Sequence, residues 1–158
     1  LSASIFLGIK KSKYSNIIVM DGDLQHDPKY LPKIIKLFKL YNPDFIVCSR
    51  NFKKRSGLSL LRYFSSIFLI LIIKVLFGSK LSDPMSGFFM FKKKIFFKYK
   101  NQMHGKGFKF LFDIFYQKKV KFKFIEYKIR FMKRKKNVSK MNFLVLFHLF
   151  ISIFKKIF

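Results

Sequence analysis

The sequence predicts an α/β domain in which a mostly parallel sheet is flanked by helices. Two apolar segments of strand length, residues 16–20 and 44–50, enclose an amphipathic helical pattern. A strand, a helix and a second strand in this order form a right-handed crossover between parallel strands. The chain has 158 residues, of which 51% are hydrophobic, so one domain with its own core is expected.

The first half of the chain predicts four elements in order. Residues 1–12 carry a helical pattern that is already under way at the first residue, and residues 16–20 form a strand. In the next helix Pro32 suits the first turn, apolar residues recur at helical spacing, and an Asn-Pro pair ends the helix. Residues 44–50 then form the second strand.

The second half of the chain begins with a helical pattern over residues 58–77. Its uncharged stretch between Arg62 and Lys74 is shorter than the roughly 20 apolar residues that a bilayer requires. A buried core helix and a helix on a membrane surface both remain open. Three further elements follow: a strand at 87–91, a helix at 107–119 and a strand at 121–131.

The C-terminal residues 141–158 are expected to form a separate segment. Residues 143–154 are apolar on nearly every face of a helix, which is typical of an interfacial helix or of the start of a truncated membrane anchor. Residues 1–140 would then form the α/β domain itself.

The charge of the chain is strongly positive, with 34 Lys and Arg against 7 Asp and Glu and a formal net charge of +27. Such an excess attracts nucleic acid or an anionic membrane surface, although a drift of composition toward AT-rich codons produces the same excess. The phenylalanines recur at core spacing, so we expect no nucleic-acid partner. Cys48 is the single cysteine, which excludes an intrachain disulfide and fits a reducing interior.

Three of the few carboxylates lie in the segment VMDGDLQHDP, residues 19–28. Asp21 and Asp23 are two residues apart, and in an extended segment such side chains point the same way. Mg²⁺ or Mn²⁺ between them would relieve their repulsion and leave room for phosphate oxygens. Gln25 and His26 follow within reach. A surface turn is the alternative, because Asp-Gly is a common turn pair.

Three later motifs accompany this segment in order. Ser49-Arg50 is followed by Arg62, then by SDPMSGFFMFKK at residues 82–93, and finally by IEYKIRFMKRKKNVSK at residues 125–140. Together the four motifs resemble those of family 2 glycosyltransferases, specifically the branch of dolichol-phosphate mannose synthases and related polyprenyl-phosphate glycosyltransferases.

The resemblance implies a GT-A fold in which the family's first βαβ unit, which grips the nucleotide base, would precede Leu1. It implies an inverting, metal-dependent transfer of a hexose, with mannose favoured, from a nucleotide sugar to a polyprenyl (dolichyl or undecaprenyl) phosphate. GDP-mannose and UDP-glucose are the expected donors, and Mg²⁺ or Mn²⁺ is the expected cofactor. The expected location is the cytoplasmic face of a membrane.

The resemblance also implies roles for individual side chains. Metal and donor-diphosphate ligands would be Asp21, Asp23 and Gln25. Arginines near the acceptor phosphate would be Arg50 and Arg62, and a basic loop that closes over the phosphates would contain Arg134, Ser139 and Lys140. The turn that lines the sugar and acceptor site would contain Asp83, Ser86 and Gly87. Of these, Asp23, Arg50, Arg62 and Arg134 form the expected catalytic set.

Several positions depart from the family pattern. Lys128 stands where proline is usual and Asn137 where glycine is usual, while Met85 replaces a threonine and Phe89 an arginine. The chain has no tryptophan, which excludes the QxxRW motif of processive polysaccharide synthases.

Three polar residues have two interpretations each. Asp113 is expected on a helix surface, with a site role as the lesser alternative. Glu126 is expected to pair with a basic neighbour, with a catalytic role as the lesser alternative. His26 would either touch the donor phosphate or lie on a loop surface. For the whole chain, the alternative function is a non-catalytic membrane- or nucleic-acid-binding module, or an inactive remnant of the enzyme.

Overall fold

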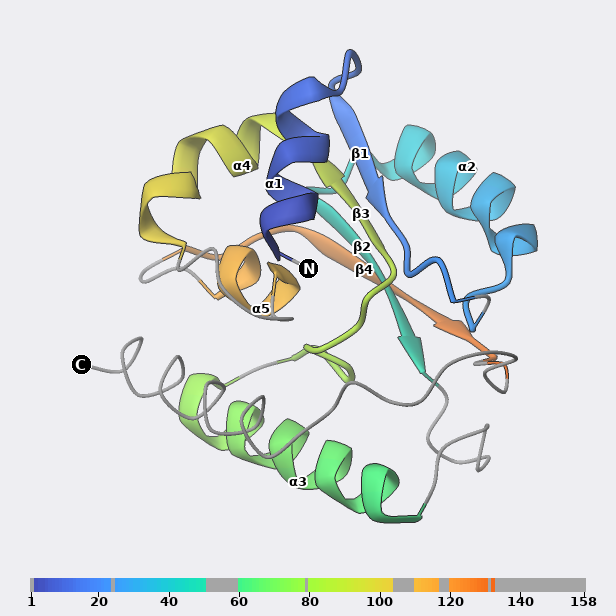
Figure 1. Ribbon diagram of the computed structural model, residues 1–158, viewed down its shortest axis with the longest axis vertical. Coiled ribbons are helices and arrows are strands. Elements are labelled where there is room, and N and C mark those ends of the chain that lie inside the picture. The colour runs from blue at the N-terminus through green and yellow to red at the C-terminus, as the bar shows by residue number, and fades with distance from the viewer. Residues whose placement is uncertain are drawn as a thin grey trace.

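The computed structural model describes residues 2–23, 25–50, 60–78, 80–103, 110–116, 120–130 and 132. A four-stranded sheet forms its centre, in the order β1 (Asn16–Val19), β3 (Phe89–Lys92), β2 (Phe45–Arg50) and β4 (Phe124–Ile129) (Figure 1). β2 and β4 are parallel, whereas β3 runs antiparallel to both β1 and β2. Strands β1, β2 and β4 therefore share one direction, and the predicted α/β class is confirmed. Two of the three pairings between neighbouring strands are nevertheless antiparallel, so the described sheet is mixed.

The position of each strand follows from its side chains. In β2 the residues from Phe45 to Ser49 are all buried, as expected for a central strand that has a covered face on both sides. β1 lies at an edge of the described sheet, and its first residue is exposed. β3 inserts between β1 and β2 with Val47 opposite Phe89, so the crossover that joins β1 to β2 spans one intervening strand.

Helices cover both faces of the sheet. On one face, α1 (Ser2–Lys11), α4 (Lys93–Tyr99) and α5 (Phe110–Phe115) contribute to one apolar core. On the other face, α2 (Leu31–Tyr41) packs its buried face into a second core. Two short 3₁₀ turns, η1 (Pro28–Tyr30) and η2 (Lys100–Gln102), precede α2 and follow α4. The sequence did not predict α4, whereas the helices at 1–12 and 31–41 are confirmed.

The Asn-Pro pair ends α2 as predicted. Asn42 adopts a left-handed conformation with φ 44°, and its backbone N–H donates to the Phe38 carbonyl at 3.0 Å. Asparagine tolerates this backbone region better than most residues, and the proline that follows cannot continue a helix.

Helix α3 (Leu60–Phe77) lies beyond the carboxyl ends of β1 and β2 and packs against α5 (Figure 1). Leu69 and Ile73 pack with Phe112 of α5 in a small third core, and Met85 packs against the same cluster. The Met85 side chain, which replaces the family's threonine, thus anchors α3. Within the described part of the chain, no helix is both long enough and apolar enough to cross a membrane.

Candidate active site at the carboxyl edge of the sheet

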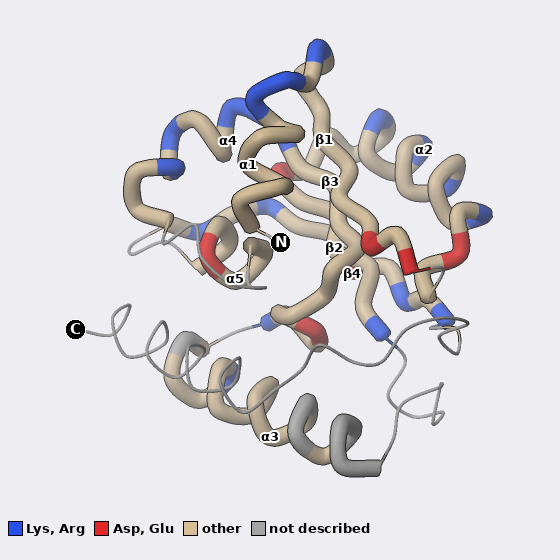
Figure 2. The backbone as a smooth tube through the Cα atoms, viewed as in Figure 1, with Lys and Arg blue, Asp and Glu red and all other residues tan. Residues whose placement is uncertain are grey.

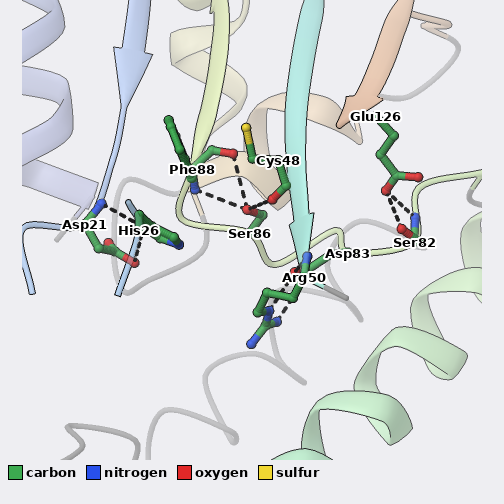
Figure 3. Close-up of polar contacts among 9 residues, drawn as sticks. All are labelled: Asp21, His26, Cys48, Arg50, Ser82, Asp83, Ser86, Phe88 and Glu126. Atoms are coloured by element: carbon green, nitrogen blue, oxygen red, sulfur yellow. Dashed lines mark hydrogen bonds and ion pairs between the residues drawn. The ribbon is translucent and has the colours of Figure 1, made fainter. Parts of the chain in front are cut away.

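One edge of the sheet brings together most of the predicted site residues that the structure describes. β1, β2 and β4 end there, and β3 begins there because it runs the other way. The edge therefore receives residues 20–23 after β1, Arg50 at the end of β2, residues 82–88 before β3, and Arg130 and Met132 after β4. We call it the site edge, and Figure 3 shows its polar contacts. Ligands of open α/β sheets bind at such an edge.

Arg50 and Asp83 form a two-pronged ion pair at the site edge (Figure 3). Arg50 Nε donates to Asp83 Oδ2 at 2.6 Å, and Arg50 Nη2 donates to Asp83 Oδ1 at 2.9 Å. The Arg50 backbone N–H also donates to Asp83 Oδ2 at 3.3 Å. The Asp83 side chain is 0% exposed and that of Arg50 is 15% exposed. The carboxylate therefore fixes the direction of the guanidinium.

Charges around Arg50 keep it ionised. Burial by itself lowers the pKa of the guanidinium, but Asp83 and, more weakly, Asp21 raise it, and the balance is a raised pKa. A guanidinium carries five N–H donors, and the side-chain contacts to Asp83 use two of them. Arg50 is thus a permanently positive group held in one orientation.

Asp21 lies directly against Gly87. A Cβ added at Gly87 would collide with the Asp21 carboxylate, with Asp21 Cγ only 2.8 Å away. Real Cβ atoms essentially never approach another atom so closely, so the carboxylate occupies space that only glycine leaves. The Asp21 side chain keeps 37% of its surface exposed. The carboxylate is thus both confined on one side and accessible to a ligand on the other.

His26 holds the backbone of Asp21 (Figure 3). Asp21 N–H donates to His26 Nδ1 at 3.3 Å, and the imidazole ring packs against Phe88 with its centroid 5.3 Å from that of the phenyl ring. Burial lowers the pKa of His26 to about 4, although Asp23 opposes this shift. His26 is therefore neutral near pH 7, and it is buried rather than on a loop surface.

The segment around Gly22 and Asp23 bends, so the expectation of an extended chain across the two aspartates is wrong. Asp23 Oδ1 accepts from the Gln25 backbone N–H at 3.1 Å, a local turn that aspartate side chains favour. Gln25 is buried and bonds to Met132 in both directions: Gln25 Nε2 donates to the Met132 carbonyl at 3.2 Å, and Met132 N–H donates to the Gln25 carbonyl at 2.9 Å. Gln25 thus ties the aspartate segment to the chain beyond β4.

Ser86 is buried and stabilises the start of β3 (Figure 3). Its hydroxyl donates to the Cys48 carbonyl at 2.6 Å and accepts from the Phe88 backbone N–H at 3.1 Å. Ser86 was predicted to line the sugar and acceptor site. In the structure it lies at the site edge, where its contacts hold the 82–88 segment beside β2.

Two predicted environments of acidic side chains are wrong. Glu126 does not pair with a basic neighbour among the described residues; its Oε1 accepts from the Ser82 backbone N–H at 2.7 Å and from the Ser82 hydroxyl at 2.6 Å. Asp113 does not lie on a helix surface, because its side chain is buried in α5. Strand β4 places the Glu126 carboxylate beside the loop that contains Ser82.

The described residues of the site edge supply only part of the set of ligands that a metal ion needs. Among the described residues, no group of three or more His, Cys, Asp and Glu side chains is arranged to hold a metal ion. Two carboxylates with an exposed side, however, suit Mg²⁺, which is bound in many enzymes by one or two carboxylates together with substrate phosphates and water. The accessible carboxylate of Asp21 fits this mode, and Asp23 follows it after one glycine.

Other predicted site residues lie outside the description. Arg62 belongs to the first turn of α3, but its side chain is not described, and Arg134, Ser139 and Lys140 lie beyond the described residues. The apolar segment 143–154 also lies there. Phe89, which replaces the family's arginine, is buried in the core with its ring stacked on Phe110 at 5.9 Å between centroids.

Sequence comparison identifies the family of the chain. Residues 1–99 match the model of Glycosyl transferase family 2, and this range contains the described contacts of Asp21, Arg50, Asp83 and Gly87. The chain is also 30% identical over 118 residues to a dolichol-phosphate mannosyltransferase of Pyrococcus furiosus, an alignment that covers 72% of this chain. It covers 33% of that relative, so the chain spans about a third of the relative's length. The chain therefore belongs to glycosyl transferase family 2 and has the GT-A fold of that family.

Proposed function

We propose that the protein transfers a hexose, with mannose favoured, from a nucleotide sugar to a polyprenyl phosphate, with inversion and with the help of Mg²⁺ or Mn²⁺. The family and the name of the Pyrococcus furiosus relative support a glycosyl transfer of this kind. The observation that carries the proposal is that Asp21 and a largely buried Arg50, held in one orientation by Asp83, lie at the same edge of the sheet.

The donor would bind through its diphosphate. When the bond between the anomeric carbon and the diphosphate oxygen breaks, negative charge grows on the leaving nucleoside diphosphate. A divalent ion supplies Lewis-acid stabilisation of that charge. Asp21 and Asp23 would hold the ion, while the His26 ring would hold the backbone of Asp21 and the Gln25 backbone N–H would orient the Asp23 carboxylate.

The acceptor would bind through its own phosphate. A polyprenyl phosphate is already an anionic nucleophile near neutral pH, so the reaction needs no strong general base. Arg50, whose guanidinium is oriented by Asp83, would grip a phosphate oxygen, as guanidinium groups do at phosphate sites. Attack from the face opposite the leaving group inverts the anomeric carbon.

The acceptor's hydrocarbon chain requires that the enzyme work at a membrane, and α3 carries a suitable surface. Phe64, Phe68, Leu71 and Val75 recur at intervals of three or four residues and are 62%, 60%, 54% and 81% exposed. We call these four residues the α3 apolar stripe. A helix that packs one face on the protein and exposes apolar side chains on another suits a membrane surface. We propose that the protein works on the cytoplasmic face of a membrane, and the exposed stripe on α3 supports contact with a membrane surface.

The test is a transfer assay. The protein, together with any upstream coding sequence, is expressed in membranes and supplied with labelled GDP-mannose or UDP-glucose and a polyprenyl phosphate. We expect Mn²⁺- or Mg²⁺-dependent formation of a glycosylated lipid from one donor, and loss of at least 100-fold in the Asp23→Ala variant, because the leaving diphosphate loses its main electrostatic support.

Absence of product with every donor, from protein that is folded by circular dichroism, would contradict the proposal. The chain would then be a non-catalytic remnant or a basic binding module. The latter predicts phosphate binding that is independent of divalent metal and steeply dependent on salt.

A further inference from the structure

A hollow lies at the sheet edge opposite the site edge, where β1 and β2 begin and β3 ends. Its volume is about 520 Å³. The side chains around it come from the end of β3 and the start of α4, and from the turns before β1 and β2: Asn16, Asn42, Lys92, Lys93, Lys94 and Phe97. The described residues that line it include three lysines and no carboxylate. We call it the lysine hollow.

Two of these lysines are held in place by hydrogen bonds. Lys92 Nζ donates to the Asn42 carbonyl at 2.9 Å and lies 3.4 Å from Asp44 Oδ1. Lys93 Nζ donates to the Ser12 carbonyl at 2.6 Å. An ammonium group has three donors, so each lysine retains capacity to donate to a ligand. The hollow is thus already ordered, which lowers the entropic cost of binding.

The burial of Lys92 and Lys93 distinguishes them from the surface lysines that a drift in composition would add. The Lys92 side chain is only 18% exposed and Lys93 is half-buried, whereas lysines are seldom so buried unless they serve a contact. Lys94 follows directly and is exposed, and Lys98 and Lys100 lie further along the same segment. Figure 2 shows lysines and arginines grouped along α4 and at the end of α1, above the strands. Like charges gathered in this way are relieved when an anion binds.

We propose that the lysine hollow is an accessory binding site for a soluble oxyanion that carries two or more negative charges, of which pyrophosphate is the simplest probe. The asparagine amides and lysine ammonium groups supply donors to its oxygens. A membrane lipid headgroup is the wrong source for this anion, because the hollow lies at the far end of the sheet from α3 and its apolar stripe (Figure 1).

The test measures the melting temperature of the protein against pyrophosphate concentration, at constant ionic strength and with divalent metals chelated. Chelation removes the metal that diphosphate binding at the site edge would require, and the Lys94 variant below assigns the effect to the hollow, so the result does not depend on transferase activity. We expect a rise of about 3 °C or more at ten times the dissociation constant. In Lys94→Gln, the pyrophosphate concentration that gives half the rise should increase about five-fold or more, because one charged donor is lost.

Lys36→Gln on the exposed face of α2 is the matched control, since it removes the same charge from another exposed position. It should leave the half-rise concentration unchanged. An equal shift of the half-rise concentration in both variants would overturn the proposal, because it would show that pyrophosphate binding depends on the net charge of the protein and not on the hollow. The absence of any rise in the unmodified protein would overturn it as well.

Discussion

Gly87 is the residue at which the site edge tolerates change least, because the Asp21 carboxylate lies against its α-carbon. We expect Gly87→Ala to push Asp21 out of place and to abolish Mn²⁺ binding. The fold should survive, since the carboxylate is 37% exposed and can move toward solvent. Mn²⁺ binding can be measured from the loss of the free-ion signal in electron paramagnetic resonance, and folding from circular dichroism.

A second glycine provides the control for this variant. Gly8 lies within α1, and a Cβ added there meets no atom within 4 Å. Gly8→Ala should therefore leave Mn²⁺ binding intact and stabilise the protein by about 0.5–1 kcal/mol, the usual difference between glycine and alanine inside a helix. Normal Mn²⁺ binding by Gly87→Ala would refute the close packing that we describe.

His26 should make the stability of the metal-free protein depend on pH. Its pKa is about 4 in the folded protein and 6.5 ordinarily, so the unfolded chain takes up the proton first as pH falls. The free energy of unfolding is therefore highest above pH 6.5, where His26 is neutral in both the folded and the unfolded chain. It falls between pH 6.5 and 4, where only the unfolded chain binds the proton. The loss should approach about 3 kcal/mol, the value of a shift of this size. Urea unfolding at several pH values measures it.

His26→Asn separates this effect from other titrations. Asparagine does not titrate, but its side-chain oxygen can still accept from the Asp21 backbone N–H that His26 Nδ1 now binds. The fall in stability between pH 6.5 and 4 should be shallower in the variant than in the unmodified protein. Identical pH profiles would show that His26 is not the buried neutral group described here.

Removing one partner of the Arg50–Asp83 ion pair should greatly lower the free energy of unfolding. Asp83→Ala leaves a buried guanidinium without its counter-ion, and we expect a loss of about 3–5 kcal/mol in the free energy of unfolding. The double variant Arg50→Met with Asp83→Leu should recover most of that loss, because no buried charge remains. A loss below about 1 kcal/mol in Asp83→Ala would mean that the pair behaves as a surface ion pair.

At the scale of the elements, periodicity predicted most of the fold. β1, β2 and α2 are local patterns of apolar residues, and their observed bounds differ from the predicted ones by a residue or so. The pairing of β3 between β1 and β2 was not predictable, because an antiparallel insertion depends on contacts between residues far apart in the chain. α4 was missed because its seven residues are too few to establish a helical period.

The α3 apolar stripe makes a prediction at the same scale. If the stripe contacts the membrane, Phe64→Gln with Phe68→Gln should weaken binding to vesicles of neutral and anionic lipid about ten-fold or more, because two large apolar side chains no longer enter the bilayer. Sedimentation of the protein with vesicles gives the affinity. Leu40→Gln with Tyr41→Gln on α2 is the matched control, since both residues are also exposed. Equal effects of the two pairs would contradict a role for α3.

In the whole molecule, the topology of the sheet brings motifs that are far apart in the sequence to one edge, where they form a single site. The spacing of Asp21 and Asp23 drew attention to the first motif, but Arg50, Asp83 and Gly87 were selected through the resemblance to the family, and the reversed direction of β3 places them at a single edge with Asp21. Sequence could not predict which of these residues touch, because the fork between Arg50 and Asp83 joins residues 33 positions apart. Nor could it find the bonds from Gln25 to Met132, since backbone partners carry no residue signature.

We propose that Asp21 and Asp23 hold a divalent ion together with a diphosphate at the site edge. The most direct measurement is the binding of Mn²⁺, followed by electron paramagnetic resonance, with and without GDP or UDP, in the unmodified chain and in Asp21→Asn and Asp23→Asn. We predict Mn²⁺ binding that a nucleoside diphosphate strengthens and that each variant weakens at least ten-fold, because each removes one charged ligand. Mn²⁺ binding of equal strength in all three proteins would contradict the assignment of Asp21 and Asp23 as metal ligands.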